Sequence, residues 1–93
     1  MSRKQELLLF VSGMSFRSVT AIENIHLLIE KFHPENFSLR IIDINIEKEE
    51  AVKYQIVAIP TLIRLMPEPK QIIIGDLSDT KKVVERLDLD GIA

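Results

Sequence analysis

Residues 61–74 read Thr-Leu-Ile-Arg-Leu-Met-Pro-Glu-Pro-Lys-Gln-Ile-Ile-Ile, and this stretch decides which fold the chain can adopt. Thr61-Leu-Ile-Arg-Leu-Met66 and Lys70-Gln-Ile-Ile-Ile74 are apolar runs of strand length. Pro67 and Pro69 lie between them and cannot donate to a sheet ladder, so this segment must be a turn or an extended connector. The stretch therefore predicts an antiparallel hairpin.

The N-terminal half of the chain predicts a strand, a helix and a second strand. Residues 6–11 are a short apolar run, typical of a strand buried on both faces. Apolar residues then recur at spacings of three and four over residues 19–32, and Ser15 or Ser18 can cap this amphipathic helix. A second apolar run at residues 37–42 completes the pattern of a right-handed βαβ unit.

A short helix is predicted immediately before the hairpin. Residues 47–56 contain strong helix formers and place Val52 and Ile56 on one face. Glu49 precedes Lys53 by four residues, a spacing that favours an ion pair along the helix.

A last helix is predicted after the hairpin. Gly75 breaks the apolar run, Asp76 and Ser78 offer N-caps, and Val83 begins the inner face. Residues 88–93 are expected to fray. The complete order, βαβαββα, is that of thioredoxin-like α/β proteins, and we expect one such domain over residues 1–93.

The composition excludes several classes of function. The chain has no cysteine, which removes thiol redox chemistry, iron–sulfur clusters and cysteine-ligated zinc, and which fits a reducing cytoplasm. A formal net charge of -2 gives no field that attracts nucleic acid. No apolar run approaches the ~18 residues of a membrane span, and the start of the chain lacks a signal-peptide core. We therefore predict a cytoplasmic protein with neither nucleic-acid nor membrane partners.

Three segments resemble, in the same order, the KaiB family of bacterial clock proteins: Ala58-Ile-Pro-Thr-Leu62, Pro67-Glu-Pro69 and Ile72-Ile-Ile-Gly-Asp-Leu-Ser-Asp79. Val11-Ser-Gly13, Arg17-Ser-Val19 and Ile41-Ile-Asp43 extend the resemblance over nearly the whole chain. The sensory domain of the KaiC-binding histidine kinase SasA resembles KaiB only up to the proline pair. The resemblance assigns the fold-determining or switch positions to Ala58, Pro60, Thr61, Pro67, Pro69, Gly75, Asp76, Ser78 and Asp79. Arg86, which departs from the family pattern, is added to this set.

The resemblance implies a non-catalytic adaptor that binds a KaiC-type ATPase and modulates its phosphorylation or ATPase state. Members of the family exchange between the thioredoxin-like fold and a ground-state fold, βαββααβ, in which the C-terminal half is rearranged and tetramers form. On this basis only the thioredoxin-like form binds KaiC, and the complex then captures KaiA and displaces the kinase. Such exchange requires two packings of one sequence that differ by only a few kcal/mol.

The sequence departs from the family pattern at Arg86, where cyanobacterial members commonly have glycine. Arginine is better than glycine in a helix by somewhat under ~1 kcal/mol, so Arg86 should favour the thioredoxin-like fold. The sequence also ends at Ala93, without the acidic extension common in clock members. It leaves open a role in a circadian clock or in KaiC-linked stress or growth regulation, and assembly into a dimer or a tetramer.

A thioredoxin-fold enzyme of redox or glutathione-dependent type is the first alternative, and a KaiC-binding sensory module that does not switch fold is the second. Thioredoxin-like oxidoreductases carry Cys-x-x-Cys where this chain has Ser12-Gly-Met-Ser15, and serine cannot form a disulfide, so helix capping is favoured over catalysis. Ile59-Pro60 occupies the place of the cis-proline in thioredoxin-like folds, and we expect a cis bond that shapes a loop.

No catalytic, cofactor or metal site is predicted. His26 and His33 are the only histidines, and no cysteine completes a ligand set. Asp43, Asp76 and Asp79 fit strand ends and helix caps better than a catalytic pair.

The partner-binding surface is assigned to the predicted helix over residues 47–56. The resemblance implies that KaiB proteins bind KaiC through this region, and the residues selected are Lys53, Tyr54, Gln55 and Ile56. The alternative is a solvated charged helix face without a partner.

Overall fold

The elements follow one another in the predicted thioredoxin-like order βαβαββα. The computed structural model describes residues 4–89. The strands are β1 (Gln5–Val11), β2 (Phe37–Asp43), β3 (Thr61–Met66) and β4 (Gln71–Ile74). The helices are α1 (Phe16–Lys31), α2 (Lys48–Lys53) and α3 (Thr80–Arg86), with a 3-10 turn, η1 (Pro34–Asn36), after α1. The alternative order βαββααβ is not the one seen here.

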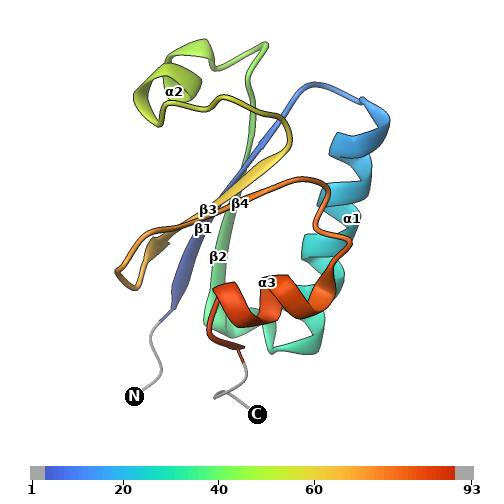
Figure 1. Ribbon diagram of the computed structural model, residues 1–93, viewed down its shortest axis with the longest axis vertical. Coiled ribbons are helices and arrows are strands. Elements are labelled where there is room, and N and C mark those ends of the chain that lie inside the picture. The colour runs from blue at the N-terminus through green and yellow to red at the C-terminus, as the bar shows by residue number, and fades with distance from the viewer. Residues whose placement is uncertain (1–3, 90–93) are drawn as a thin grey trace.

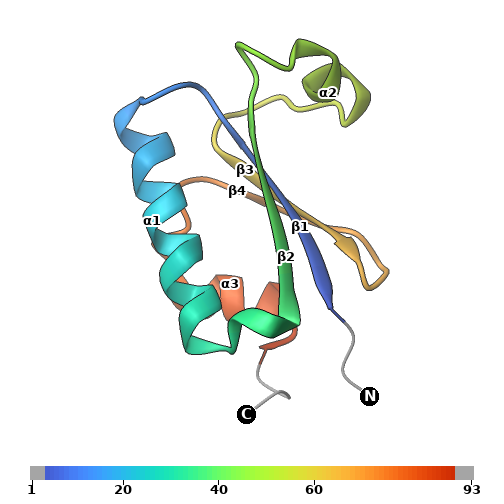
Figure 2. The same ribbon diagram turned by 180° about the vertical axis from the view of Figure 1, so that it is seen from behind.

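The four strands form one mixed sheet in the order β2-β1-β3-β4. β1 is parallel to β2 and antiparallel to β3, and β4 is antiparallel to β3, so the predicted hairpin is confirmed. α1 and α3 lie together on one side of the sheet, whereas α2 lies on the other side near one end (Figures 1 and 2). One face of the sheet is therefore covered by two helices, and the other by residues before and after α2, among them Ile44, Tyr54, Ile56 and Ile59.

β1 is buried on both faces, as its apolar run predicts. Leu7, Leu9 and Val11 join a core cluster with residues of α1 and α3. Leu8 and Phe10 alternate with them and belong to a second cluster on the opposite face. The period of two in a strand thus divides one apolar run between two cores.

α1 begins where the sequence predicts. Ser15 is its N-cap, and the hydroxyl oxygen accepts a hydrogen bond of 3.4 Å from the amide of Ser18. The residues of α1 buried against the sheet are spaced by three and four: Ser18, Ala21, Ile25 and Leu28.

The predicted helix over residues 47–56 is shorter than expected, because α2 ends at Lys53. Gln55 has a φ of +54°, a left-handed conformation that cannot continue a helix. Val52 is 77% exposed and Ile56 lies beyond the helix, so the helix face that these two residues were predicted to share does not form. Ile56 instead packs against the second cluster from the segment after the helix.

The acidic residues of α2 pair with β2 and not along the helix. Arg40 contacts Glu47 and lies 3.6 Å from Glu50, measured from Nη1 to Oε1. No ion pair joins Glu49 to Lys53 among the residues that the structure describes, so that prediction is wrong. The Lys53 ammonium lies instead over the ring of Tyr54.

α3 is capped by Asp79 and not by Asp76 or Ser78. The Asp79 carboxylate accepts a hydrogen bond of 3.2 Å from the amide of Lys82. Asp76 instead accepts a hydrogen bond of 3.0 Å from the amide of Ser78, which closes a local turn before the helix. The predicted cap was therefore misplaced by one to three residues.

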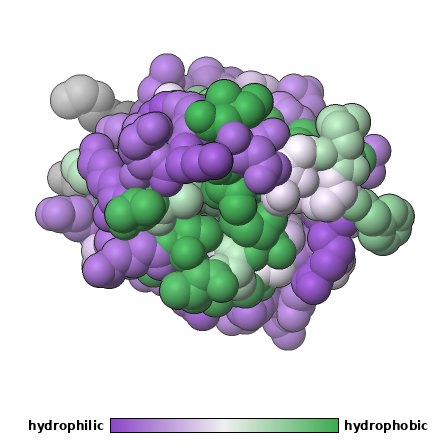
Figure 3. Space-filling view, turned by 90° about the horizontal axis from the view of Figure 1, so that it is seen from above, coloured by the Kyte–Doolittle hydropathy of each residue, from purple (hydrophilic) through white to green (hydrophobic). Residues whose placement is uncertain are grey.

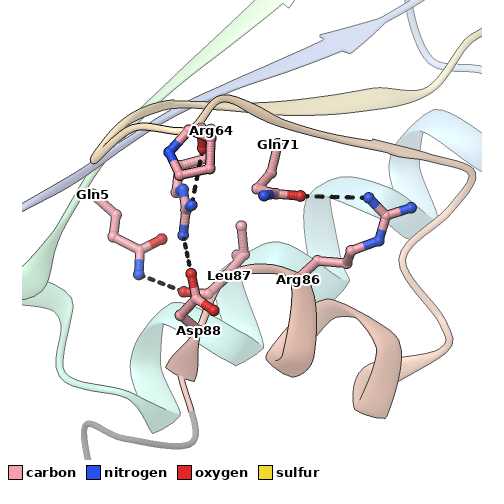
Figure 4. Close-up of polar contacts among 7 residues, drawn as sticks. Gln5, Arg64, Gln71, Arg86, Leu87 and Asp88 are labelled. Atoms are coloured by element: carbon pink, nitrogen blue, oxygen red, sulfur yellow. Dashed lines mark hydrogen bonds and ion pairs between the residues drawn. The ribbon is translucent and has the colours of Figure 1, made fainter.

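Residues 88 and 89 are fixed in place, contrary to the expected fraying of residues 88–93; residues 90–93 lie outside the described part of the chain. Leu89 is completely buried in the first core cluster. Asp88 accepts a hydrogen bond of 3.1 Å from Arg64 Nη1 (Figure 4).

Arg64 is the largest buried polar side chain and joins three parts of the C-terminal half. Its guanidinium is 1% exposed and also donates, through Nη2, a hydrogen bond of 3.0 Å to the carbonyl of Pro69 in the β3–β4 turn. Nearby, the buried Gln5 amide donates a hydrogen bond of 2.7 Å to the carbonyl of Leu87 (Figure 4). The end of α3 is thereby held to β1, β3 and the hairpin turn.

Replacing Asp88 with asparagine should lower the free energy of unfolding by about 1 kcal/mol. The change keeps the size of the side chain and suits the left-handed backbone at this position, where φ is +57°. It removes the negative charge that faces the buried Arg64 guanidinium, and the exposure of Asp88 reduces the effect below that of a buried pair. Urea denaturation measures it. Glu85→Gln, an exposed change on α3, is the control and should alter stability by less than about 0.5 kcal/mol.

Candidate functional site

Four of the positions assigned to fold determination, Ala58, Pro60, Thr61 and Gly75, meet where β3 begins and β4 ends. The Ile59-Pro60 bond is cis, as predicted. The Thr61 hydroxyl donates a hydrogen bond of 2.7 Å to the carbonyl of Ala58, and the amide of Gly75 donates one of 2.9 Å to the carbonyl of Pro60. Two segments that are separate in sequence thus close one end of the hairpin.

The segment from Gly75 to Asp79 connects β4 to α1 as well as to α3. Gly75 has a φ of +118°, which side chains rarely tolerate. The Asn24 side chain on α1 donates a hydrogen bond of 2.9 Å to the carbonyl of Asp76. Hydrogen bonds from Ser78 lower the pKa of the Asp76 carboxyl below its ordinary value. Its charged form thus supports the turn that leads into α3.

The two prolines of the hairpin turn and Arg86 lie near the other end of β4. Both the Met66-Pro67 and the Glu68-Pro69 bonds are cis. Arg86 Nη1 lies 3.5 Å from Oε1 of Gln71 (Figure 4). It also lies 3.4 Å from the carbonyl oxygen of Ile72. Its helix propensity was read from the sequence, but these contacts with the edge of the sheet were not.

The serines at the place of the thioredoxin cysteines form local hydrogen bonds. The Ser15 and Ser18 hydroxyls are 2.8 Å apart, and the Ser12 hydroxyl accepts a hydrogen bond of 3.1 Å from the Asn45 side chain. The amide of Ser12 donates a hydrogen bond of 3.1 Å to the Ser18 hydroxyl. These contacts connect the start of α1 to the ends of β1 and β2.

The four residues selected for partner binding take different structural roles. Lys53 and Gln55 are exposed, and the Lys53 ammonium lies 5.3 Å from the centre of the Tyr54 ring. The Tyr54 ring packs on Phe10, with ring centres 5.8 Å apart, and Ile56 is partly buried beside it. Two of the four are therefore exposed, and the other two are half-buried side chains that also pack against the second core cluster.

Exposed apolar side chains lie in α2 and on either side of it in the sequence. We call Ile46, Val52 and Val57 the α2-end patch. They are 78%, 77% and 90% exposed, respectively. Figure 3, which looks onto this end of the molecule, shows apolar side chains gathered between hydrophilic ones. Beside the patch, Ala51, Val52, Gln55, Ile56 and Val57 line a shallow depression. Ile46 and Val57 were missed in the sequence because they lie just outside the predicted helix.

Residues 4–89 contain no cluster of metal ligands and no helix that could span a membrane. Among residues 4–89, no group of three or more histidine, cysteine or acidic side chains could hold a metal. His33 lies 3.9 Å from Glu35, and both are exposed. None of the helices in this range is long and apolar enough to cross a membrane.

Comparison with known families decides the family of this chain. A family profile described as the KaiB domain matches residues 8–89, which include both sides of the hairpin and the capped helix α3. The chain belongs to the KaiB family. The circadian clock protein KaiB3 of Synechocystis is 39% identical over 83 residues, which are 89% of this KaiB chain and 81% of that relative. The clock oscillator protein KaiB of Prochlorococcus marinus is 37% identical, over 89% of this chain and 73% of its own.

Solved structures confirm the thioredoxin-like fold of this KaiB-family chain. The N-terminal domain of Synechococcus elongatus SasA superposes with a TM-score of 0.75 at 21% identity, covering 95% of this chain and 87% of that one. The germline thioredoxin Deadhead of Drosophila melanogaster superposes with a TM-score of 0.75 at 17% identity, covering 91% and 79%. At such identities the likeness shows the fold alone. The sequence of this chain contains no cysteine.

Substitutions at Val57 and Ile56 should distinguish a residue of the exposed α2-end patch from one that packs against the second core cluster. Val57→Asp should change the free energy of unfolding by less than about 0.5 kcal/mol, because the side chain is already in water. Ile56→Ala should lower it by about 1–2 kcal/mol, less than for a fully buried isoleucine, because it removes packing from the second core cluster. Urea denaturation of both variants measures the difference, and equal losses would contradict this division.

Proposed function

We propose that this KaiB-family chain is a non-catalytic, cytoplasmic adaptor that binds a KaiC-type ATPase and modulates its phosphorylation or ATPase state. The fold supports the proposal, because the family resemblance implies that KaiC binding requires the thioredoxin-like form, and the chain has that form. In a cyanobacterial-type system the complex would then bind a KaiA-like protein or displace a histidine kinase.

The α2-end patch is the observation that carries this proposal. Three apolar side chains are each more than three-quarters exposed at one end of the molecule. Exposed apolar groups gathered on one face and rimmed by polar residues are typical of protein-binding sites. Lys53 and Gln55 provide polar groups beside the patch. Tyr54 and Ile56 pack against the second core cluster and so fix the backbone of this segment. We thus extend the predicted contact set of residues 53–56 to Ile46, Val52 and Val57.

Of the ten fold-determining positions, Arg86 is the one that supports a resting state in the thioredoxin-like form. We propose that Arg86 contributes through its helix propensity and its contacts with β4, and that the rearranged βαββααβ form is less populated here. The same reasoning makes a tetramer of the rearranged form a minor species. A redox or glutathione-dependent enzyme is disfavoured, because serine hydroxyls stand where such enzymes have thiols.

Val57→Asp should abolish most of the binding to a KaiC hexamer. A carboxylate at the centre of an apolar contact must lose its water, and a weakening of at least about tenfold is expected. Size-exclusion chromatography with a KaiC hexamer and ATP measures co-elution. Leu27→Asp is the matched control, because Leu27 is 69% exposed on α1 and outside the patch.

The two variants test whether the α2-end patch is the KaiC contact. Binding by Leu27→Asp but not by Val57→Asp supports the patch as the contact. Equal binding by both variants would place the contact elsewhere on an adaptor. Failure of the wild-type chain to bind any KaiC hexamer would overturn the adaptor proposal.

Arg86→Gly should slow the appearance of the KaiC complex over hours. Glycine weakens α3 by about 1 kcal/mol and releases the contacts with β4, which shifts the population away from the binding form. The same chromatographic assay, sampled over time after mixing, measures the rate. An unchanged rate would favour the alternative of a sensory module that does not switch fold.

A further inference from the structure

β4 forms an open edge of the sheet with unusual composition. The strand order leaves one side of β4 without a neighbouring strand in the described residues. Its sequence, Gln71-Ile-Ile-Ile74, carries no charge. Edge strands of natural proteins usually carry charged residues, prolines or bulges that prevent pairing with another chain. None of these lies within β4 itself.

The backbone groups that face this open side belong to Ile72 and Ile74. In an antiparallel pair, successive residues point their amide and carbonyl groups alternately toward the partner and away from it. Gly75 donates to the carbonyl of Pro60 and therefore faces β3, so Ile73 also faces β3. Arg86 provides independent evidence, because its guanidinium approaches the carbonyl of Ile72 from outside the sheet.

The side chains of the same two residues form an apolar border along the edge. Ile72 and Ile74 are 43% and 55% exposed. Ile72 pairs with Ile63 of the second core cluster, so both lie on the face opposite α1 and α3. The edge thus offers hydrogen-bonding groups and apolar surface together.

Arg86 of α3 is the group that covers this edge. Its Nη1 lies 3.4 Å from the Ile72 carbonyl oxygen and 3.5 Å from the Gln71 side chain, and Arg86 itself is exposed. Contacts of this length on an exposed side chain are weak and exchange readily with water. The cover is therefore removable without unfolding the strand.

We propose that β4 pairs antiparallel with β4 of a second copy of this chain, and that Arg86 limits this association. The two open edges join with Ile72 of each copy opposite Ile74 of the other. This register uses every outward amide and carbonyl of both strands and extends the two four-stranded sheets into one. It involves neither KaiC nor the α2-end patch.

A second copy fits this edge better than an unrelated strand because the register is self-complementary. The two-fold axis passes at Ile73. The side chains of Ile72 and Ile74 from both copies then form one apolar cluster on the face opposite α1 and α3. A four-residue strand provides a small interface, so the dimer is weak and depends on concentration.

Sedimentation velocity over a range of protein concentrations tests the association. Arg86→Ala keeps a good helix former in α3, and it should raise the dimer association constant by up to about fivefold, the ratio expected for loss of an exposed polar contact. Adding Ile74→Lys to that variant should abolish the dimer, because it places two charges at the joined edges. Adding Ile41→Lys, the same change on the opposite edge strand β2 where Ile41 is 38% exposed, should leave the dimer intact.

Cysteine cross-linking tests the register, since the natural chain has no cysteine. An oxidised mixture of Ile72→Cys and Ile74→Cys chains should form mixed disulfide dimers in preference to either variant alone, because only unlike positions face each other across the proposed pair. A monomeric Arg86→Ala variant at all concentrations, loss of the dimer through Ile41→Lys, or equal cross-linking in all samples would overturn the proposal.

Discussion

The burial of β1 on both faces is the constraint on which the other layers depend. Five consecutive apolar residues, from Leu7 to Val11, are removed from water, and each large side chain contributes about 1.5–3 kcal/mol when fully buried. Since neighbouring side chains point to opposite faces, each face needs its own cover. α1 and α3 supply one, while Tyr54, Ile56 and Ile59 complete the other from the segment after α2. The residues of the α2-end patch lie in and next to the segment that covers this second face.

The C-terminal half is held by polar contacts as much as by apolar packing. Arg64 is buried beneath the hairpin turn and the end of α3, so its guanidinium must find partners that folding itself supplies. Among the described residues its Nε finds none, nor does the side-chain oxygen of Gln5. A buried network with atoms left unpaired makes this region sensitive to the exact path of the chain after Leu87.

Two apolar surfaces left open by the fold lie on different elements. The α2-end patch is built from side chains around a short helix, whereas the β4 edge combines backbone groups with isoleucines. A partner at the α2-end patch would contact side chains, whereas a strand at the β4 edge would pair with the backbone and extend the sheet. The first surface is the one assigned to the proposed adaptor function. The second rests only on the geometry of this chain, including Arg86.

The sequence alone determined the strands, the long helix, the hairpin, the cis bond before Pro60 and the family, because these depend on local periodicity and short motifs. It did not determine the end of α2, the Asp79 cap, the pairing of Arg40 with α2 or the burial of Arg64 and Leu89. Gln5 and Leu87 are 82 positions apart, and Arg64 and Asp88 are 24 apart, so only folding brings them together. The tertiary structure decided which polar side chains are buried and which apolar ones remain exposed. Both depend on how the helices and loops pack on the two faces of the sheet, and that packing joins residues far apart in the sequence.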